Sequence, residues 1–237
     1  KVLFMKLDIL VFGAHPDDVE LGCGGTIIKE VQNGKKVGVI DLTRGELGTR
    51  GTSKTRDIET RNATNILGIH LRDNMNFKDG FFKNDQEHKI HLIKKIRKYC
   101  PEIVITNAIS DRHPDHSRSS NLTIDSCFLS GLEKIDTGQR PWRPKAIYHY
   151  IQFNNILPDF VVDISEQMDL KMKAIEAYST QFYDPNSVET ETIISSPEFL
   201  ESVDYRAKDL GRQSNCTYAE GFLVHQMPKI SSLLDLI

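Results

Sequence analysis

Several features that mark membrane, nucleic-acid-binding or secreted proteins are missing from this sequence of 237 residues. No apolar run approaches the roughly 18 residues that a membrane-spanning helix needs. The first apolar stretch is also too short for a secretory signal. The formal net charge is −3, whereas a nucleic-acid-binding surface would make the chain strongly basic. We therefore expect neither a membrane nor a nucleic acid as a partner.

Cysteine is scarce and unpaired in the sequence. The four cysteines are scattered at Cys23, Cys100, Cys127 and Cys216, and no two of them form a Cys-x-x-Cys pair. This usage is typical of free thiols in a reducing compartment, so we expect a cytoplasmic protein.

Internal repeats and low-complexity tracts are absent from the sequence as well. The length fits a single domain over residues 1–237. Met5 is the expected natural start, and residues 1–4 are then additions in front of it.

The order of predicted elements indicates an α/β protein. Strands are predicted at 7–12, 37–42, 103–106, 146–152, 160–164 and 218–226, and helices at 26–33, 54–67, 86–99, 114–130, 167–182 and 197–210, with a turn-rich link at 74–80. We expect a Rossmann-like, three-layer α/β fold with a mostly parallel sheet and helices on both faces. Ligands bind at the carboxyl ends of the strands in such sheets.

Two clusters of metal-ligand residues follow predicted strands. His15 and Asp18 are three residues apart after the first strand, and His113 and His116 repeat that spacing after the strand at 103–106. Catalytic zinc usually has three protein ligands, which His15, Asp18 and one histidine of the second cluster would supply. Asp17 is then free to act as a base on water. On its own, a His-x-x-Asp in a loop is more often solvated or caps a helix.

The two clusters together resemble a known family. Ala14-His15-Pro16-Asp17-Asp18 with Gly24-Gly25-Thr26, followed by His113-Pro114-Asp115-His116, resembles the LmbE-like (PIG-L) family of zinc-dependent N-acetylglucosaminyl deacetylases. Residues 41–51, 163–165, 174–182 and 218–222 are similar to the bacillithiol-biosynthesis branch of that family. The branch removes acetate from N-acetylglucosaminyl-malate.

The resemblance implies a role for six residues. His15, Asp18 and His116 would be the ligands of Zn²⁺, although such a site can also take Fe²⁺ or Co²⁺. Asp17 would be the general base. A protonated His113 would steady the oxyanion, with Asp115 as its carboxylate partner.

A small-molecule sugar conjugate is the expected partner, and four residues are expected to bind it: Arg56, Asp79, Arg112 and Glu46. The glycine-rich segment 43–54 has the composition of a surface loop, and the resemblance makes it a loop that covers the substrate. Malate carries two carboxylates, and arginines lie in or near the predicted site loops. Because relatives are commonly oligomeric, we also expect a homo-oligomer.

Two other interpretations remain open from the sequence. The protein could be a deacetylase or amidase of the same family that acts on another N-acetylated sugar. It could also be a non-catalytic nucleotide-binding Rossmann module, since the first loop is rich in glycine. Against this module, the loop lacks Gly-x-Gly-x-x-Gly directly after the strand, and Asp17 and Asp18 would repel a phosphate.

Overall fold

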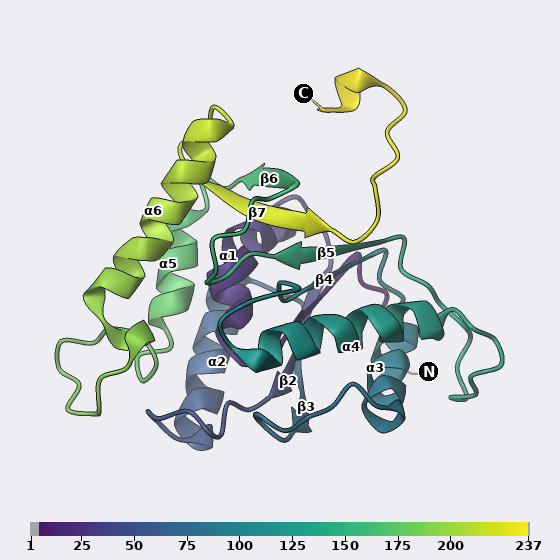
Figure 1. Ribbon diagram of the computed structural model, residues 1–237, viewed down its shortest axis with the longest axis horizontal. Coiled ribbons are helices and arrows are strands. Elements are labelled where there is room, and N and C mark those ends of the chain that lie inside the picture. Colours follow the sequence, from purple (N-terminus) through teal and green to yellow (C-terminus); the bar gives the residue numbers. More distant parts are fainter. Residues whose placement is uncertain (1–4, 237) are drawn as a thin grey trace.

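A seven-stranded sheet forms the centre of the computed structural model, which describes residues 5–236 (Figure 1). The expected additions at 1–4 lie outside the described residues. The strands are β1 (Ile9–Gly13), β2 (Val37–Thr43), β3 (Leu71–Phe77), β4 (Ile103–Thr106), β5 (Ala146–Tyr150), β6 (Phe160–Asp163) and β7 (Ala219–Val224). The helices are α1 (Asp18–Gln32), α2 (Ser53–Leu67), α3 (Gln86–Tyr99), α4 (Pro114–Ser130), α5 (Met168–Glu176) and α6 (Pro197–Gln213), with 3₁₀ turns η1 (Ile193–Ser195) and η2 (Leu233–Leu236).

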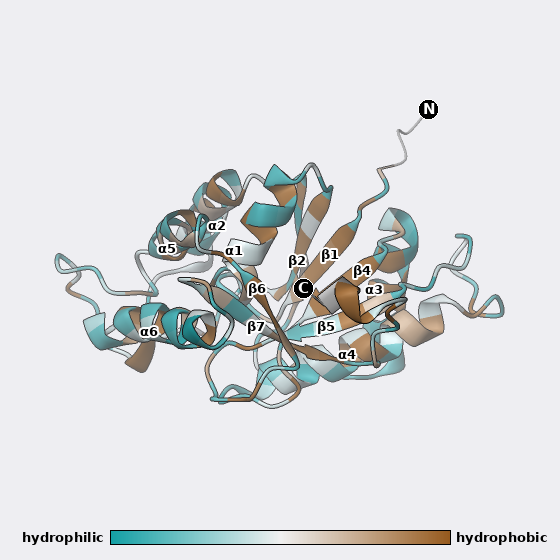
Figure 2. Ribbon diagram, turned by 90° about the horizontal axis from the view of Figure 1, so that it is seen from above, coloured by the Kyte–Doolittle hydropathy of each residue, from teal (hydrophilic) through white to brown (hydrophobic). Residues whose placement is uncertain are grey.

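Helices cover both faces of the sheet, as expected for a three-layer α/β fold (Figure 2). Strand β1 is buried on both sides, and its alternate residues face opposite layers. Leu10 and Phe12 pack with residues of α3 and α4, whereas Val11 packs with residues of α1, including Ile27. None of the helices within residues 5–236 combines the length and apolarity needed to cross a membrane.

The strand order places a crevice beside β1. The sheet runs β3-β2-β1-β4-β5-β7-β6, and the first five strands in sequence are parallel, while β7 is antiparallel to both of its neighbours. Along the chain, β2 and β3 are therefore added on one side of β1, and β4 and β5 are then added on its other side. The carboxyl ends of β1 and β4 flank this reversal, which is where open α/β sheets bind ligands.

One predicted connection is a strand. The sequence predicts a turn-rich link at 74–80, but β3 extends to Phe77 and only the Asp79-Gly80 turn follows it. β3 is an edge strand that pairs only with β2, so its sequence can be polar. The polar sequence lacks the apolar pattern from which the other strands were predicted. The predicted helix at 167–182 is also shorter, since α5 ends at Glu176.

Helix α1 is interrupted, and its glycines pack against neighbouring side chains. The backbone leaves helical geometry at Cys23 (φ −148°, ψ 22°). The N–H groups that follow, of Gly25 and Thr26, donate to the Glu220 carboxylate at 2.9 and 2.7 Å. Gly22 lies directly on the ring of Tyr150, so that a Cβ at this position would be 2.1 Å from the ring.

We predict that Gly22→Ala lowers the free energy of unfolding by about 1–3 kcal/mol, the usual cost of overpacking. Tyr150 is fully buried and has no room to retreat. Gly24→Ala is the matched control in the same helix, because the nearest atom to its new Cβ would be 3.6 Å away. Urea unfolding of both variants measures the difference. Equal stability of the two variants would contradict this packing.

Candidate functional site

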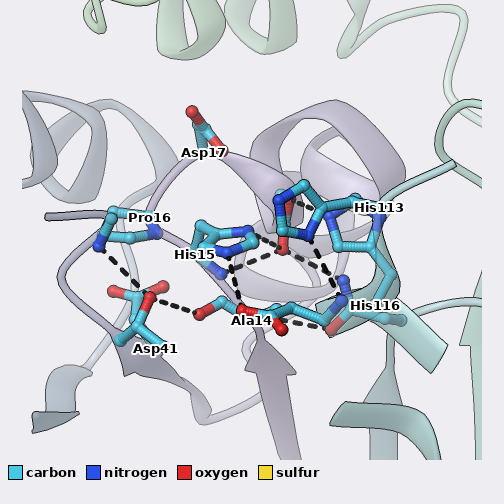
Figure 3. Close-up of polar contacts among 12 residues, drawn as sticks. Ala14, His15, Pro16, Asp17, Asp41, His113 and His116 are labelled. Atoms are coloured by element: carbon cyan, nitrogen blue, oxygen red, sulfur yellow. Dashed lines mark hydrogen bonds and ion pairs between the residues drawn. The ribbon is translucent and has the colours of Figure 1, made fainter. Parts of the chain in front are cut away.

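Three histidines meet in the crevice between β1 and β4. His15 lies in the turn between β1 and α1, while His113 and His116 lie at the start of α4. Their rings face one another in Figure 3, with centroids 4.7 Å apart for His15 and His113 and 5.3 Å apart for His113 and His116. Each ring offers a nitrogen within 4.8 Å of the others. The parallel sheet thus brings together two clusters that are about a hundred residues apart in sequence.

The carboxylate of Asp18 lies between two of these histidines. Its Oδ2 is 3.5 Å from Nδ1 of His15, and its Oδ1 is 3.1 Å from Nε2 of His116. Asp18 is buried, and Asn107 and Gln152 donate to its two oxygens at 3.1 and 2.7 Å. These contacts fix the direction of the carboxylate.

The remaining nitrogen of each of these two histidines faces a second carboxylate. Nε2 of His15 is 3.0 Å from Oδ1 of Asp79, and Nδ1 of His116 is 2.8 Å from Oδ2 of Asp111. Metal-binding histidines usually donate their second N–H in this way, which leaves the first nitrogen free to bind the metal. Nδ1 of His15 and Nε2 of His116 are therefore the nitrogens available for a cation.

The residues fit a tetrahedral cation such as zinc. Bonds of about 2.0–2.1 Å to nitrogen and oxygen place neighbouring ligand atoms about 3.3–3.4 Å apart, close to the separations around Asp18. The charge also fits. Burial lowers the pKa of His116, but Asp18 and Asp111 more than reverse this and raise it to about 9. The surroundings therefore stabilise positive charge at this point. His15, Asp18 and His116, the ligands that the sequence predicts, form such a set.

His113 differs from the expected imidazolium. Its Nδ1 accepts the backbone N–H of Asp115 at 3.2 Å, so its proton lies on Nε2. Burial lowers the pKa of His113, and the nearby charges of His15 and His116 lower it further. The carboxylate of Asp115 instead accepts the N–H of Gly80 at 2.8 Å and contacts His15. The expected Asp115–His113 ion pair is not the arrangement found, and His113 is suited to donate a hydrogen bond as a neutral ring.

In Figure 3, Asp17 is directed away from the histidines. Nη1 of Arg56 donates to Oδ2 of Asp17 at 3.1 Å and to the carbonyl of Pro16 at 2.7 Å. Burial raises the pKa of Asp17 to about 7, although Arg56 opposes the rise. A carboxyl group with this pKa can accept and return a proton near neutral pH.

The site opens into a cavity of ≈ 230 Å³. Its lining combines the polar side chains of His15, Asp17, His113 and His116 with five apolar ones: Leu21, Leu47, Phe153, Ile194 and Phe199. A neighbouring hollow of ≈ 410 Å³ shares Leu47, Arg112, His113 and Ile194 with it. The cavity and the hollow therefore adjoin.

The four expected substrate-binding residues fall into two groups. Arg56, Asp79 and Arg112 line the cavity. Glu46 is not among its lining residues, because its carboxylate accepts the backbone N–H of Asp79 at 2.8 Å and holds the loop that follows β2. Asp79 is itself occupied, since its second oxygen accepts the N–H of Leu47 at 3.0 Å.

Three residues that hold the ligands in place were not predicted from the sequence: Asn107, Asp111 and Gln152. Asn107 directly follows β4, and Gln152 lies two residues after β5. Their position at or after the carboxyl ends of predicted strands was the available signal, because these strand ends surround the site.

We predict that Arg56→Gln moves the acid limb of the kcat/KM profile to higher pH, by about 1 unit or more. The guanidinium stabilises the ionised form of Asp17, so its loss raises the Asp17 pKa and less of the base is ionised at a given pH. Arg61→Gln, on the exposed side of the same helix, is the control and should leave the limb in place. An unchanged limb in Arg56→Gln, or a shift to lower pH, would contradict the pairing.

Comparison with known proteins identifies the family. Residues 10–127, about half of the chain, match the family model of PIG-L, described as GlcNAc-PI de-N-acetylase. A solved structure of a conserved protein from Thermus thermophilus superposes with a TM-score of 0.87 at 33% identity, and the alignment covers 96% of this chain and 98% of that one.

Two curated relatives carry named activities. Diacetylchitobiose deacetylase of Thermococcus kodakarensis is 29% identical over 189 residues, which are 73% of this chain and 70% of the relative. A probable N-acetyl-alpha-D-glucosaminyl L-malate deacetylase 2 of Bacillus anthracis is 27% identical over 196 residues, covering 73% and 81%. Together with the family match and the T. thermophilus structure, these similarities show that the chain belongs to the PIG-L, or LmbE-like, family.

Proposed function

We propose that this protein is a metal-dependent deacetylase that removes acetate from an N-acetylglucosamine conjugate. The observation that carries the proposal is the Asp18 carboxylate between His15 and His116, at the base of a cavity that also exposes Asp17 and His113. Zinc is the metal that we favour, and the named activities of the relatives agree with this chemistry.

His15, Asp18 and His116 would hold the metal, which supplies Lewis acidity and positive charge. Asp17 takes a proton from the attacking water, whose oxygen bonds to the acetamide carbon. Nε2–H of His113 donates to the carbonyl oxygen as negative charge develops on it. When the C–N bond breaks, Asp17 returns its proton to the departing amine, and acetate and the free amino sugar result.

Arg112 supports an acidic conjugate as the substrate. Three other arginines near the cavity already have carboxylate partners: Arg44 pairs with Asp57, Arg50 with Glu189 and Arg56 with Asp17. Arg112 lines the cavity, and no carboxylate within residues 5–236 pairs with its guanidinium. Its guanidinium lies over the ring of Phe153, 4.8 Å from the centroid. An anionic group on the substrate would give this cation a partner.

We therefore propose N-acetylglucosaminyl-malate, the bacillithiol-pathway substrate, as the preferred conjugate. The malate carboxylates would reach Arg112 from the neighbouring hollow. The four cysteines are free, which supports a reducing, cytoplasmic setting for this reaction.

We expect acetate release from N-acetylglucosaminyl-malate to exceed release from N-acetylglucosamine and from N,N'-diacetylchitobiose. Arg112→Gln should lower kcat/KM for the malate conjugate about 10- to 100-fold, as expected for a lost charge-assisted contact of about 1.5–3 kcal/mol. Neutral substrates should be little affected.

Arg44→Gln is the matched control, because Arg44 pairs with Asp57 and does not line the cavity. A wild type that releases acetate equally from all three compounds would contradict the malate assignment. Release from none of them, by protein with bound metal, would contradict the deacetylase proposal.

A further inference from the structure

Three consecutive residues after β5 contact both sides of the proposed metal site. Nε2 of Gln152 donates to Oδ1 of Asp18 at 2.7 Å. The backbone N–H of Asn154 donates to Oδ1 of Asp111 at 3.0 Å, and the other oxygen of Asp111 holds Nδ1 of His116. Residues 152–154, named here the β5 strap, thus reach two proposed ligands, one directly and one through Asp111.

The middle residue of the β5 strap contributes to the cavity wall. The guanidinium of Arg112 lies over the ring of Phe153. The same ring stacks on Phe199 at a centroid distance of 6.2 Å. Asp111 also accepts the backbone N–H of Arg112 at 2.7 Å. The same short segment therefore positions the metal ligands and the cation proposed to bind the substrate.

Helix α6 contacts the β5 strap through a hydrogen bond from Arg206. Nη2 of Arg206 donates to the backbone carbonyl of Phe153 at 3.0 Å. Arg206 is not among the residues that line the main cavity, so it reaches neither a bound metal nor a bound substrate directly. Arg206 can act on them through the strap, and its charge also acts on Asp111, which holds His116.

We infer that Arg206 is a positioning residue: through the β5 strap it holds Asp18 and His116 in the geometry that binds the metal and supports Arg112 at the substrate end. The inference rests on the metal site of the proposed function. Because a hydrogen bond from α6 holds the strap carbonyl, its loss lets residues 152–154 shift and disturbs both ends together.

The test is a cobalt titration of metal-free protein, followed by its visible d–d absorption. Partners behind metal ligands typically contribute 10- to 100-fold to metal affinity. We expect Arg206→Met to weaken Co²⁺ binding by about 10-fold and to change the d–d spectrum. Arg206→Lys, which can still donate to the carbonyl, should recover much of both. Arg212→Met, on the same helix but paired with the exposed Asp209, should match the wild type.

A second variant keeps the test decisive if Arg206→Met folds poorly. Asp111→Asn breaks the link to His116 from the other side and should weaken Co²⁺ binding about 10- to 100-fold. Near-ultraviolet circular dichroism of the metal-free proteins checks that they are folded. In activity assays, Arg206→Met should also raise KM for N-acetylglucosaminyl-malate more than for N-acetylglucosamine.

A folded Arg206→Met protein with wild-type cobalt affinity and spectrum would overturn the inference, and so would a folded Asp111→Asn protein that binds cobalt like the wild type. The titration needs no substrate, so failure of the deacetylase proposal leaves it interpretable. If the wild type is an active deacetylase but Arg206→Met leaves cobalt binding unchanged, the role of Arg206 is refuted and the deacetylase proposal stands.

Discussion

The buried carboxylate of Asp18, placed between two imidazoles, is the constraint on which the rest of the site depends. Removing an ionised carboxylate from water costs several kcal/mol unless other groups compensate. Here Asn107, Gln152 and the backbone N–H of His15 donate to it, at 2.7–3.1 Å. These donors come from the ends of three strands, β1, β4 and β5, so the charge can be held only when the sheet is correctly assembled. Folding and site formation are therefore linked.

Negative charge gathers around the same point. Asp18, Asp79, Asp111 and Asp115 all lie against His15 or His116. Such a concentration of carboxylates would repel an anionic ligand, which argues against a phosphate-binding Rossmann module and for a cation site. The guanidinium of Arg112, proposed to bind an acidic substrate, lies over Phe153 and is not paired with any of these four carboxylates. In the proposed function, the metal and the acidic group of the substrate therefore contact different residues of one cavity.

Local patterns in the sequence were enough to predict the core of this arrangement. Buried runs such as 103–106 predicted parallel strands, and the repeated spacing of His15–Asp18 and His113–His116 predicted two clusters at neighbouring strand ends. The family resemblance was confirmed by the comparisons. The edge strand β3 was missed because a strand paired on one side only does not need an apolar sequence.

Side-chain pairing was the part that the sequence could not provide. The partner of Arg56 is Asp17, 39 residues away in sequence, and the carboxylate of Asp115 contacts His15 rather than its near neighbour His113. Gln152 reaches Asp18 because β5 lies beside β4, whereas Asp111 contacts His116 from the same connection between β4 and α4. Asp115 contacts His113 through its backbone N–H, while its carboxylate lies against His15.

The presence of a metal at Asp18 can be tested directly by anomalous diffraction at the zinc absorption edge, on crystals grown with zinc. We expect one strong peak per chain, in contact with Nδ1 of His15, a carboxylate oxygen of Asp18 and Nε2 of His116. A peak held instead by Asp79 and Asp115, or no peak within reach of Asp18 at full zinc saturation, would contradict this site.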